Sequence, residues 1–302
     1  MLRARSLPQQ NSIFSESVME DLQKDIRGFR AIAEILKDMI GINLEENEKN
    51  LFLMAGRLNK VLRKMEISTY QEYIVHLKSG EPEHLNSLVT AMTTNTTEFF
   101  REPQHFDLLK TVAREILLRK GANNELRIWC SASSTGQEAY TIAMALEEAR
   151  SLLPAFKLKM LATDIDSVVL QKASQGLYTQ GDVASVPAFI RQKYFQPVSD
   201  FSKDKEKSKE KMYQVSPQLQ QSIRFASFNL LSETYPFQFP FDIIFCRNVL
   251  IYFDRPTSAG IIAKFAGALG SNSYLFLGHA ETGTMQNKDL KLAGSALYQK
   301  KT

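Results

Sequence analysis

The chain has 302 residues, of which 44% are hydrophobic and 23% charged, and a formal net charge of +4 at neutral pH. No apolar run approaches the roughly 20 residues needed to cross a bilayer and the N-terminus has no apolar signal core, so we expect a cytoplasmic protein without membrane insertion. Two cysteines, Cys130 and Cys246, are too few and too far apart for a disulfide framework or a compact metal motif. The small positive charge does not choose between nucleic acid, membrane and acidic protein partners.

The first region follows a tail (residues 1–14) and is expected to be all-helical over residues 15–92. Within Leu53–Met65, apolar residues at helical spacing form one face. Gly41 and Gly80 stand where helices typically end. The opposite face of this helix is basic, which indicates either a solvated surface or a docking face for an acidic partner; its residues are Arg57, Lys60, Arg63 and Lys64.

After Gly121, short β-branched or aromatic runs alternate with helical stretches. This alternation predicts an α/β fold with a parallel sheet covered by helices on both faces. The expected strands are Leu126–Cys130, Leu158–Thr163, Ile223–Ser227, Phe241–Cys246 and Tyr274–Gly278, with one terminal strand within Leu292–Lys300, and the expected helices include Glu138–Arg150 and Val168–Ala173.

One segment interrupts the alternation. The run Lys203–Lys211 is highly charged and has no apolar residue, which is typical of a solvated loop. It lies between Tyr194–Phe195 and Met212–Val215, so we expect a small β-hairpin, within an inserted β-subdomain at about residues 180–222.

Ligands of open α/β sheets bind beyond the carboxyl ends of the strands, where the strand order reverses. The first strand ends in a turn of small residues, Ser131–Gly136, and the second in Thr163–Asp166. Asp164 suits binding of the two hydroxyls of a ribose, whereas Asp166 suits the N-cap of the next helix. Glu138, in the first turn of the next helix, either binds a ligand or complements the helix dipole.

The later strands are followed by further polar and aromatic residues, Phe228–Leu230 and Arg247–Tyr252, which together make a coherent wall for a site. Metalloprotease, serine-hydrolase and nucleotide-phosphate motifs do not occur, and the four histidines form no cluster in the sequence. We therefore expect no metal and no hydrolase chemistry.

Five blocks then carry a family resemblance: TTNTTEFFRE with His105–Phe106, RIWCSASSTGQEAY, ATDID, FDIIFCRNVLIYFD and LFLGHAE. In this order they closely resemble the CheR family of chemotaxis-receptor glutamate methyltransferases over nearly the whole chain. The resemblance implies a Rossmann-like domain (residues 93–302) that uses S-adenosylmethionine (SAM) and releases S-adenosylhomocysteine. It also implies an N-terminal helical domain (15–92) that docks on the receptor, and γ-carboxylates of receptor glutamates as the substrate.

Carried over by position, the resemblance implies that Arg101 and Tyr252 face the methyl-transfer position and that the basic face of the helical domain contacts the receptor. In some members the β-subdomain grips a peptide at the receptor's C-terminus, whereas here its turn is a lysine/glutamate run without glycine. We expect a monomer. The implied cofactor contacts are Asn95, Thr97, Arg101, Glu138, Asp164, Asn229, Leu230, Asn248 and Val249.

Two alternatives have specific tests in the sequence. A methyltransferase acting on RNA or DNA, or on another protein, shares the sheet and the ribose-binding aspartate. However, Asn248 is followed by Val-Leu-Ile-Tyr and not by the proline-proline-aromatic run of base-modifying enzymes. A SAM-binding sensor without catalysis is disfavoured because Arg101 and Tyr252 are both present.

Overall fold

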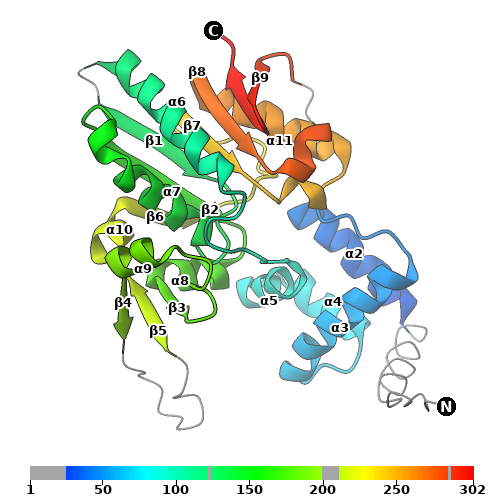
Figure 1. Cartoon of the computed structure of the whole chain (residues 1–302). Helices are drawn as coiled ribbons and strands as arrows, with labels where there is room; N and C mark the ends of the chain where they lie inside the picture. The colour runs from blue at the N-terminus through cyan, green and yellow to red at the C-terminus, as the bar shows by residue number, and fades with distance from the viewer. Residues whose placement is uncertain (1–24, 122–123, 199–210, 285–286) are drawn as a thin grey trace, which may run out of the picture. The chain divides into compact units, whose positions relative to one another are not determined.

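The computed structural model describes residues 25–121, 124–198, 211–284 and 287–302. The chain divides into two compact units, Met1–Thr93 and Thr94–Thr302 (Figure 1). The expected tail at residues 1–14 and most of the charged run, residues 203–210, lie outside the described residues. No helix in the described part of the chain is long and apolar enough to cross a membrane.

The described part of the first unit is helical, as predicted. Side chains that favour N-cap positions begin three of its helices, because Asp25, Asn47 and Thr69 each accept a hydrogen bond from a backbone N–H of the first turn. Gly41 ends the first of these helices with φ 72°, the left-handed conformation that glycine adopts without strain. The helices are α2 (Ile26–Ile40), α3 (Glu48–Lys64), α4 (Tyr70–Lys78) and α5 (Pro82–Met92).

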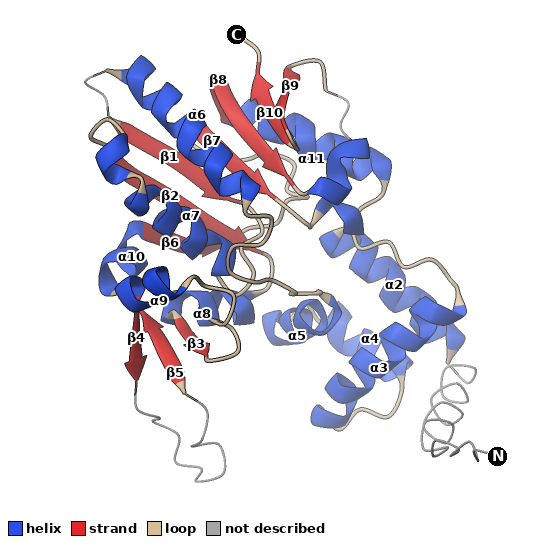
Figure 2. Cartoon of the chain, in the orientation of Figure 1, coloured by secondary structure: helices blue, strands red, loops and turns tan. Residues whose placement is uncertain are grey.

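The second unit is built on a seven-stranded sheet in the order β6-β2-β1-β7-β8-β10-β9 (Figure 2). Its strands are β1 (Glu125–Cys130), β2 (Lys157–Asp164), β6 (Ile223–Ser227), β7 (Phe241–Cys246), β8 (Leu269–Leu277), β9 (Leu290–Gly294) and β10 (Leu297–Lys300). The strands from β6 to β8 run parallel, and β10 runs antiparallel to both of its neighbours. The predicted parallel sheet is confirmed in this central part.

One sequence prediction for the sheet is wrong. The single strand expected within Leu292–Lys300 is two antiparallel strands, β9 and β10, that are joined by a tight turn. Ala296 adopts φ 51° in that turn, a conformation that costs energy for any residue with a Cβ atom. An Asn-Gly or Gly-Gly pair would have predicted a turn between two strands, but this turn has no such pair.

Helices cover both faces of the sheet. Successive side chains of the central strands point to opposite faces, and the side chains on both faces are buried under helices. Ile128 and Cys130 of β1 pack in a cluster with α6 (Gln104–Lys120) and α7 (Gln137–Glu148). Trp129, between them, packs in a second cluster with α11 (Arg255–Ala268) on the opposite face (Figure 1). The remaining helical elements are η1 (Arg150–Leu152), α8 (Ser167–Gln175), α9 (Ala188–Tyr194), α10 (Pro217–Ser222), η2 (Leu250–Tyr252) and η3 (His279–Thr284).

The inserted segment forms a second, three-stranded antiparallel sheet in the order β3-β5-β4. The predicted hairpin is confirmed as β4 (Phe195–Val198) paired with β5 (Met212–Val215), and β3 (Leu177–Thr179) adds a strand that the sequence analysis did not anticipate. Tyr178 and Phe195 make edge contacts with the ring of Phe99, which ties the small sheet to the core of the unit.

Candidate functional site

The candidate site lies at the carboxyl ends of β6, β2, β1 and β7. The strand β1 pairs with β2 on one side and with β7 on the other, and the chain connections diverge from it. This reversal is the switch point at which open α/β sheets bind their ligands. The residues that follow these four strands therefore form the edge on which a cofactor would be held.

The turn between β1 and α7 is fixed by its backbone. The N–H groups of Ser131 and Ser133 donate to the carbonyls of Phe245 and Thr163, both at 2.8 Å. Gly136 has φ 96°, and a Cβ atom there would lie 2.9 Å from both the Cβ of Ala173 and the hydroxyl of Tyr178. Glycine is thus required at this position, and the turn passes close to neighbouring side chains without a side chain of its own.

The two aspartates after β2 have different tasks, as the sequence analysis predicted for Asp166. Asp166 caps α8 by accepting the N–H of Val168 at 2.9 Å. Asp164 is 8% exposed, and its two oxygens accept the N–H groups of Ser134 and Asp166 at 2.8 and 3.1 Å. Burial raises the pKa of Asp164, although these hydrogen bonds oppose the shift. Each oxygen of Asp164 retains acceptor capacity for a second donor.

The segment from Thr94 to Glu102 lies against this edge of the sheet. Asn95 donates from its amide nitrogen to Asp166 at 3.0 Å, and its carbonyl accepts the hydroxyl of Ser134 at 3.1 Å. Phe99 is 1% exposed and anchors the segment in the core. Thr97 and Arg101 are half-buried, and Arg101 donates to the carbonyl of Thr96 at 3.2 Å. The fold therefore brings Asn95 and Asp164, two of the predicted cofactor contacts, to the same turn.

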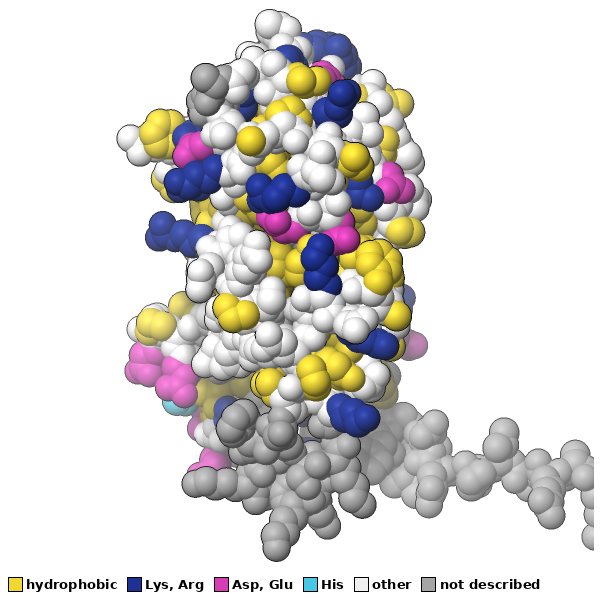
Figure 3. Space-filling view, turned by 60° about the vertical axis from the view of Figure 1, so that its left-hand side comes forward, with side chains coloured by type: hydrophobic (Ala, Val, Ile, Leu, Met, Phe, Trp, Pro, Cys, Tyr) yellow, Lys and Arg dark blue, Asp and Glu magenta, His cyan; other side chains and the backbone are white. Residues whose placement is uncertain are grey.

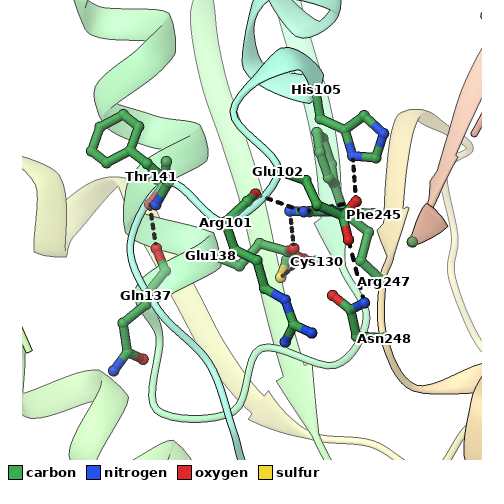
Figure 4. Close-up of polar contacts among 12 residues, drawn as sticks. Arg101, Glu102, His105, Cys130, Gln137, Glu138, Thr141, Phe245, Arg247 and Asn248 are labelled. Carbon is green, nitrogen blue, oxygen red and sulfur yellow. Dashed lines mark hydrogen bonds and ion pairs between the residues drawn. The ribbon is translucent and has the colours of Figure 1, made fainter. Parts of the chain in front are cut away.

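Arg247, which the sequence analysis did not single out, joins three segments of the site (Figure 4). Its side chain is 1% exposed, and its guanidinium contacts Glu138 at 2.6 Å and Glu102 at 3.3 Å. It also donates to the carbonyl of Arg101 at 2.7 Å. The available signal was an arginine directly after the largely apolar strand β7, since a buried arginine requires acidic partners.

The carboxylates around Arg247 have opposite pKa shifts. Burial raises the pKa of Glu138, and the attraction of Arg247 only partly opposes this effect. Burial also acts to raise the pKa of Glu102, but the charge of Arg247 and hydrogen bonds from Arg247 and Asn248 bring it below its ordinary value.

The second oxygen of Glu138, which does not contact Arg247, accepts from the Cys130 thiol at 3.3 Å. Burial raises the pKa of that thiol well above its ordinary value, which makes Cys130 an inert neutral donor.

Glu281 is a second residue that the sequence analysis missed as a functional position. Its carboxylate is 1% exposed and accepts backbone N–H groups from Asn248, Val249, Leu250 and Gly278 at 2.6 to 2.9 Å. Asn248 itself has φ 58°, which is uncommon outside glycine. The carboxylate thus holds the turn after β7 in a strained conformation, with the half-buried side chains of Asn248 and Val249 at the site.

The remaining predicted residues lie at the ends of β6 and β7. Asn229 accepts the N–H of Leu231 at 2.9 Å, and Leu230 is buried beside an aromatic cluster that includes Phe228 and Trp129. Tyr252 lies in η2 and is 36% exposed. Tyr252 is thus more exposed than Arg101, the other predicted catalytic residue, which is half-buried.

The histidines form no cluster in the sequence, but the fold brings them together in two pairs. The rings of His105 and His279 stack with their centroids 4.9 Å apart, and Glu102 lies beside both. Burial lowers the pKa of His105 to about 4. In the first unit, His76 and His84 make an edge contact at 4.9 Å.

In the first unit, the four residues of the predicted basic face do not have equal roles. Arg57 is half-buried and donates to the carbonyls of Met92 and Thr93 at 2.8 and 3.3 Å, so it closes the end of α5. Lys60, Arg63 and Lys64 are exposed. An exposed basic surface on α3 therefore consists of these three residues.

The donors and acceptors at the sheet edge fit SAM. Asp164 offers two oriented carboxylate oxygens, which match the two hydroxyls of a ribose. Leu230 and its aromatic neighbours offer an apolar wall for a purine. Glu138 offers carboxyl oxygens as acceptors for an amino group, and Arg101 is a cationic donor for a carboxylate.

Comparisons with known proteins identify the family of the chain. A model described as "CheR methyltransferase, SAM binding domain" matches residues 95–298, and "CheR methyltransferase, all-alpha domain" matches residues 27–93. The chain is 38% identical to a chemotaxis protein methyltransferase of Borreliella burgdorferi, over 89% of this chain and 92% of that one. It is 34% identical to the Escherichia coli protein of the same name, over 89% of each chain. A solved rRNA methylase from Streptococcus thermophilus is 11% identical, with a TM-score of 0.34 over 66% of this chain and 95% of that one.

Proposed function

Because the chain belongs to the CheR methyltransferase family and is a SAM-dependent methyltransferase, we propose that it methylates γ-carboxylates of glutamates in the cytoplasmic helices of chemoreceptors. The product is a glutamate methyl ester, which serves sensory adaptation in chemotaxis. The observation that carries this proposal is the match of both units, the helical one as well as the catalytic one, to the two domains of a single family.

Nine residues hold the cofactor in this proposal, and four of them have a specific chemical role. Asp164 accepts from the ribose hydroxyls, while the neutral wall at Leu230 receives the purine. Glu138 and Arg101 meet the charged groups of the methionine moiety. The full set of proposed contacts is Asn95, Thr97, Arg101, Glu138, Asp164, Asn229, Leu230, Asn248 and Val249.

The reaction requires positioning more than proton transfer. When bound, SAM supplies an electrophilic methyl group on a sulfonium. A glutamate side chain is already ionised at neutral pH, so this chain need not provide a strong base. Arg101 orients the substrate carboxylate by a charge-assisted hydrogen bond, and Tyr252 closes the wall beside it. Orientation of this kind supplies up to about 7–11 kcal/mol in favourable cases.

The receptor contact is proposed for the exposed basic surface of α3, formed by Lys60, Arg63 and Lys64. Methylation helices carry clustered glutamates, so a basic surface would raise the encounter rate with such a partner. The small sheet β3-β5-β4 is a further candidate contact for a receptor C-terminal peptide. We propose that the protein acts as a cytoplasmic monomer.

A nucleic-acid substrate has no support on the face of the molecule drawn in Figure 3. On the face drawn in Figure 3, the Lys and Arg side chains of the described residues are interspersed with acidic and apolar ones and do not form a continuous stripe. A phosphate backbone is bound by several aligned cations, which this face does not offer.

The test is incubation of the full chain with methyl-labelled SAM and receptor cytoplasmic fragments, followed by mild base. We expect base-labile label that is released as volatile methanol, the signature of a carboxyl methyl ester. Arg101→Ala should lower kcat/KM by about 100-fold or more because the substrate loses its orienting cation. Arg114→Ala, an exposed arginine on α6, is the matched control and should keep full activity. Base-stable label would exclude a glutamate ester as the product.

A further inference from the structure

Three potential metal ligands from separate parts of the second unit converge beside the candidate site. Glu102 directly precedes α6, His105 lies in its first turn, and His279 begins η3 after β8. One ligand atom from each residue lies within 4.8 Å of the others. The Glu102 carboxylate is 3.4 Å from Nδ1 of His105 and 3.6 Å from Nε2 of His279.

The protonation of His105 leaves a ligand atom directed at Glu102. Its Nε2 lies 3.2 Å from the carbonyl of Ser295, which can only accept, so Nε2 carries the proton of the neutral ring. Nδ1 then presents a lone pair, and it is buried without a hydrogen-bond partner. Histidine ligands of metal ions commonly have this arrangement, in which the second ring nitrogen donates to a carbonyl.

Two acceptor atoms face each other at the spacing of metal ligands. Nδ1 of His105 and Oε2 of Glu102 are both buried acceptors and make no hydrogen bond to each other, while Oε2 also lies 3.3 Å from the guanidinium of Arg247. Ligands at about 2.0–2.1 Å from a tetrahedral zinc ion are about 3.4 Å from one another. The two separations from Oε2 of Glu102, 3.4 and 3.6 Å, are close to this edge length, and the two imidazole nitrogens lie within 4.8 Å of each other.

We propose that Glu102, His105 and His279 bind a divalent transition-metal ion of the zinc class. Two imidazoles and one carboxylate bind such ions in preference to calcium or magnesium. Three protein ligands leave the fourth coordination position for water. Nδ1 of His105 is the fixed ligand because its ring is fully buried. His279 is the adjustable ligand, because its side chain is 38% exposed and is held by an exposed amide, that of Gln104, at 2.9 Å.

The nearby guanidinium does not prevent this binding. Arg247 lies 3.3 Å from Glu102, but Glu138 lies 2.6 Å from its other side. The group therefore contains two carboxylates and one cation, and it has a net negative charge when both carboxylates are ionised. A metal ion would share Glu102 with Arg247 and with Asn248, whose amide lies 3.4 Å from the other carboxylate oxygen.

The experiment is titration of the metal-free full chain with Zn²⁺ by calorimetry, together with the visible spectrum after addition of Co²⁺. We expect one high-affinity equivalent of Zn²⁺ and the intense bands of four-coordinate Co²⁺. His279→Ala should weaken Zn²⁺ binding by at least about tenfold. Loss of a residue that only hydrogen-bonds to a metal ligand already costs about 10- to 100-fold in affinity, and loss of a ligand should cost no less. His279→Gln provides a second variant, and thermal unfolding verifies that both are folded.

His84→Ala is the matched control, because His84 forms the other histidine pair and lies near Glu81 in the first unit. It should leave the affinity for Zn²⁺ unchanged. The proposal is overturned if no stoichiometric Zn²⁺ binding is found, if both folded His279 variants bind like the wild type, or if His84→Ala removes the binding.

Discussion

At the scale of single residues, the candidate site depends on a buried cation. Arg247 is 1% exposed at its side chain and contacts Glu138 at 2.6 Å, Glu102 at 3.3 Å and the Arg101 carbonyl at 2.7 Å. A charge of this kind is costly to bury, and removal of one partner leaves the others uncompensated. Arg247 therefore acts as a positioning residue, which holds the backbone of Arg101 and the side chain of Glu138 in fixed relation.

The first prediction is that Arg247→Met lowers the free energy of unfolding by about 3–5 kcal/mol, because two carboxylates lose their common partner. Urea denaturation measures this loss. Arg114→Met, at an exposed position on α6, is the control and should change stability by no more than about 0.5 kcal/mol. Equal stabilities of the two variants would mean that the buried network contributes nothing.

The second prediction concerns Asp164. Asp164→Asn should weaken binding of S-adenosylhomocysteine by about 10- to 100-fold, since a hydrogen bond to a charged group contributes about 1.5–3 kcal/mol. Calorimetric titration measures the affinity. Asp182→Asn, in an exposed turn where Asp182 accepts from Thr179, is the matched control. An affinity of Asp164→Asn equal to that of the control would remove Asp164 from the cofactor site.

The third prediction follows from the raised pKa of Asp164. The stability contributed by the protonated carboxyl is fully present below the unfolded-state pKa and is lost as the pH rises through the higher folded-state pKa. Ionised Asp164 therefore costs stability at neutral pH, and its charge is available for binding. As the pH is lowered, Asp164 becomes protonated and the affinity of the wild type for S-adenosylhomocysteine should fall. This fall should occur at a higher pH than it would if the aspartate had its ordinary pKa. Asp164→Asn should lack this step, and a step that persists in this variant would assign it to another group.

Residue types at strand ends are the basis of the predicted cofactor contacts, whereas contacts between positions distant in sequence give no such local signal. Asp164 and Asp166 could be interpreted from their position after one strand. Arg247 and Glu281 could not, because all but one of their partners, Gly278, are separated from them by 30 residues or more along the chain. The same reason explains why the stacking of His105 on His279 was missed.

At the scale of elements, the turn between β1 and α7 depends on a glycine. The fourth prediction is that Gly136→Ala lowers the free energy of unfolding by more than about 1–3 kcal/mol and weakens cofactor binding. The new Cβ would lie 2.9 Å from the Cβ of Ala173 at φ 96°. Gly260→Ala in α11 is the control, since a Cβ there meets nothing within 4 Å, and it should stabilise the protein by about 0.4–1 kcal/mol. Urea denaturation of both variants tests the opposite signs, and a loss of stability in neither would contradict the argument.

Elements with a strong local pattern were predicted well. The strands β6 and β7 have the predicted bounds, because each is a short β-branched or aromatic run with clear ends. The three-residue strand β3 was missed because its pairing with β5 crosses an insertion of more than 30 residues. The β9-β10 turn was missed because Ala296 occupies a conformation that residue-type preferences do not predict.

At the scale of the whole molecule, each unit has its own task in the proposed function. The second unit contains the cofactor residues, and the first unit contains the exposed basic surface of α3. These tasks are separable if substrate recognition depends on the first unit and cofactor binding on the second. Charge changes in the first unit should then affect the protein substrate alone.

The fifth prediction tests this separation with the double variant Lys60→Glu/Arg63→Glu. It should raise the KM for receptor fragments about tenfold at low salt, because like charges now face the acidic methylation helices, and the effect should shrink as salt screens the charges. The affinity for S-adenosylhomocysteine should not change. Lys157→Glu/Lys159→Glu alters the net charge equally, at exposed positions on β2 of the other unit, and should leave the KM near the wild-type value. If both double variants raise the KM alike, the receptor responds to overall charge, and α3 is not its docking surface. If only the α3 variant does so, the basic residues of α3 select the substrate while the edge of the sheet performs the transfer.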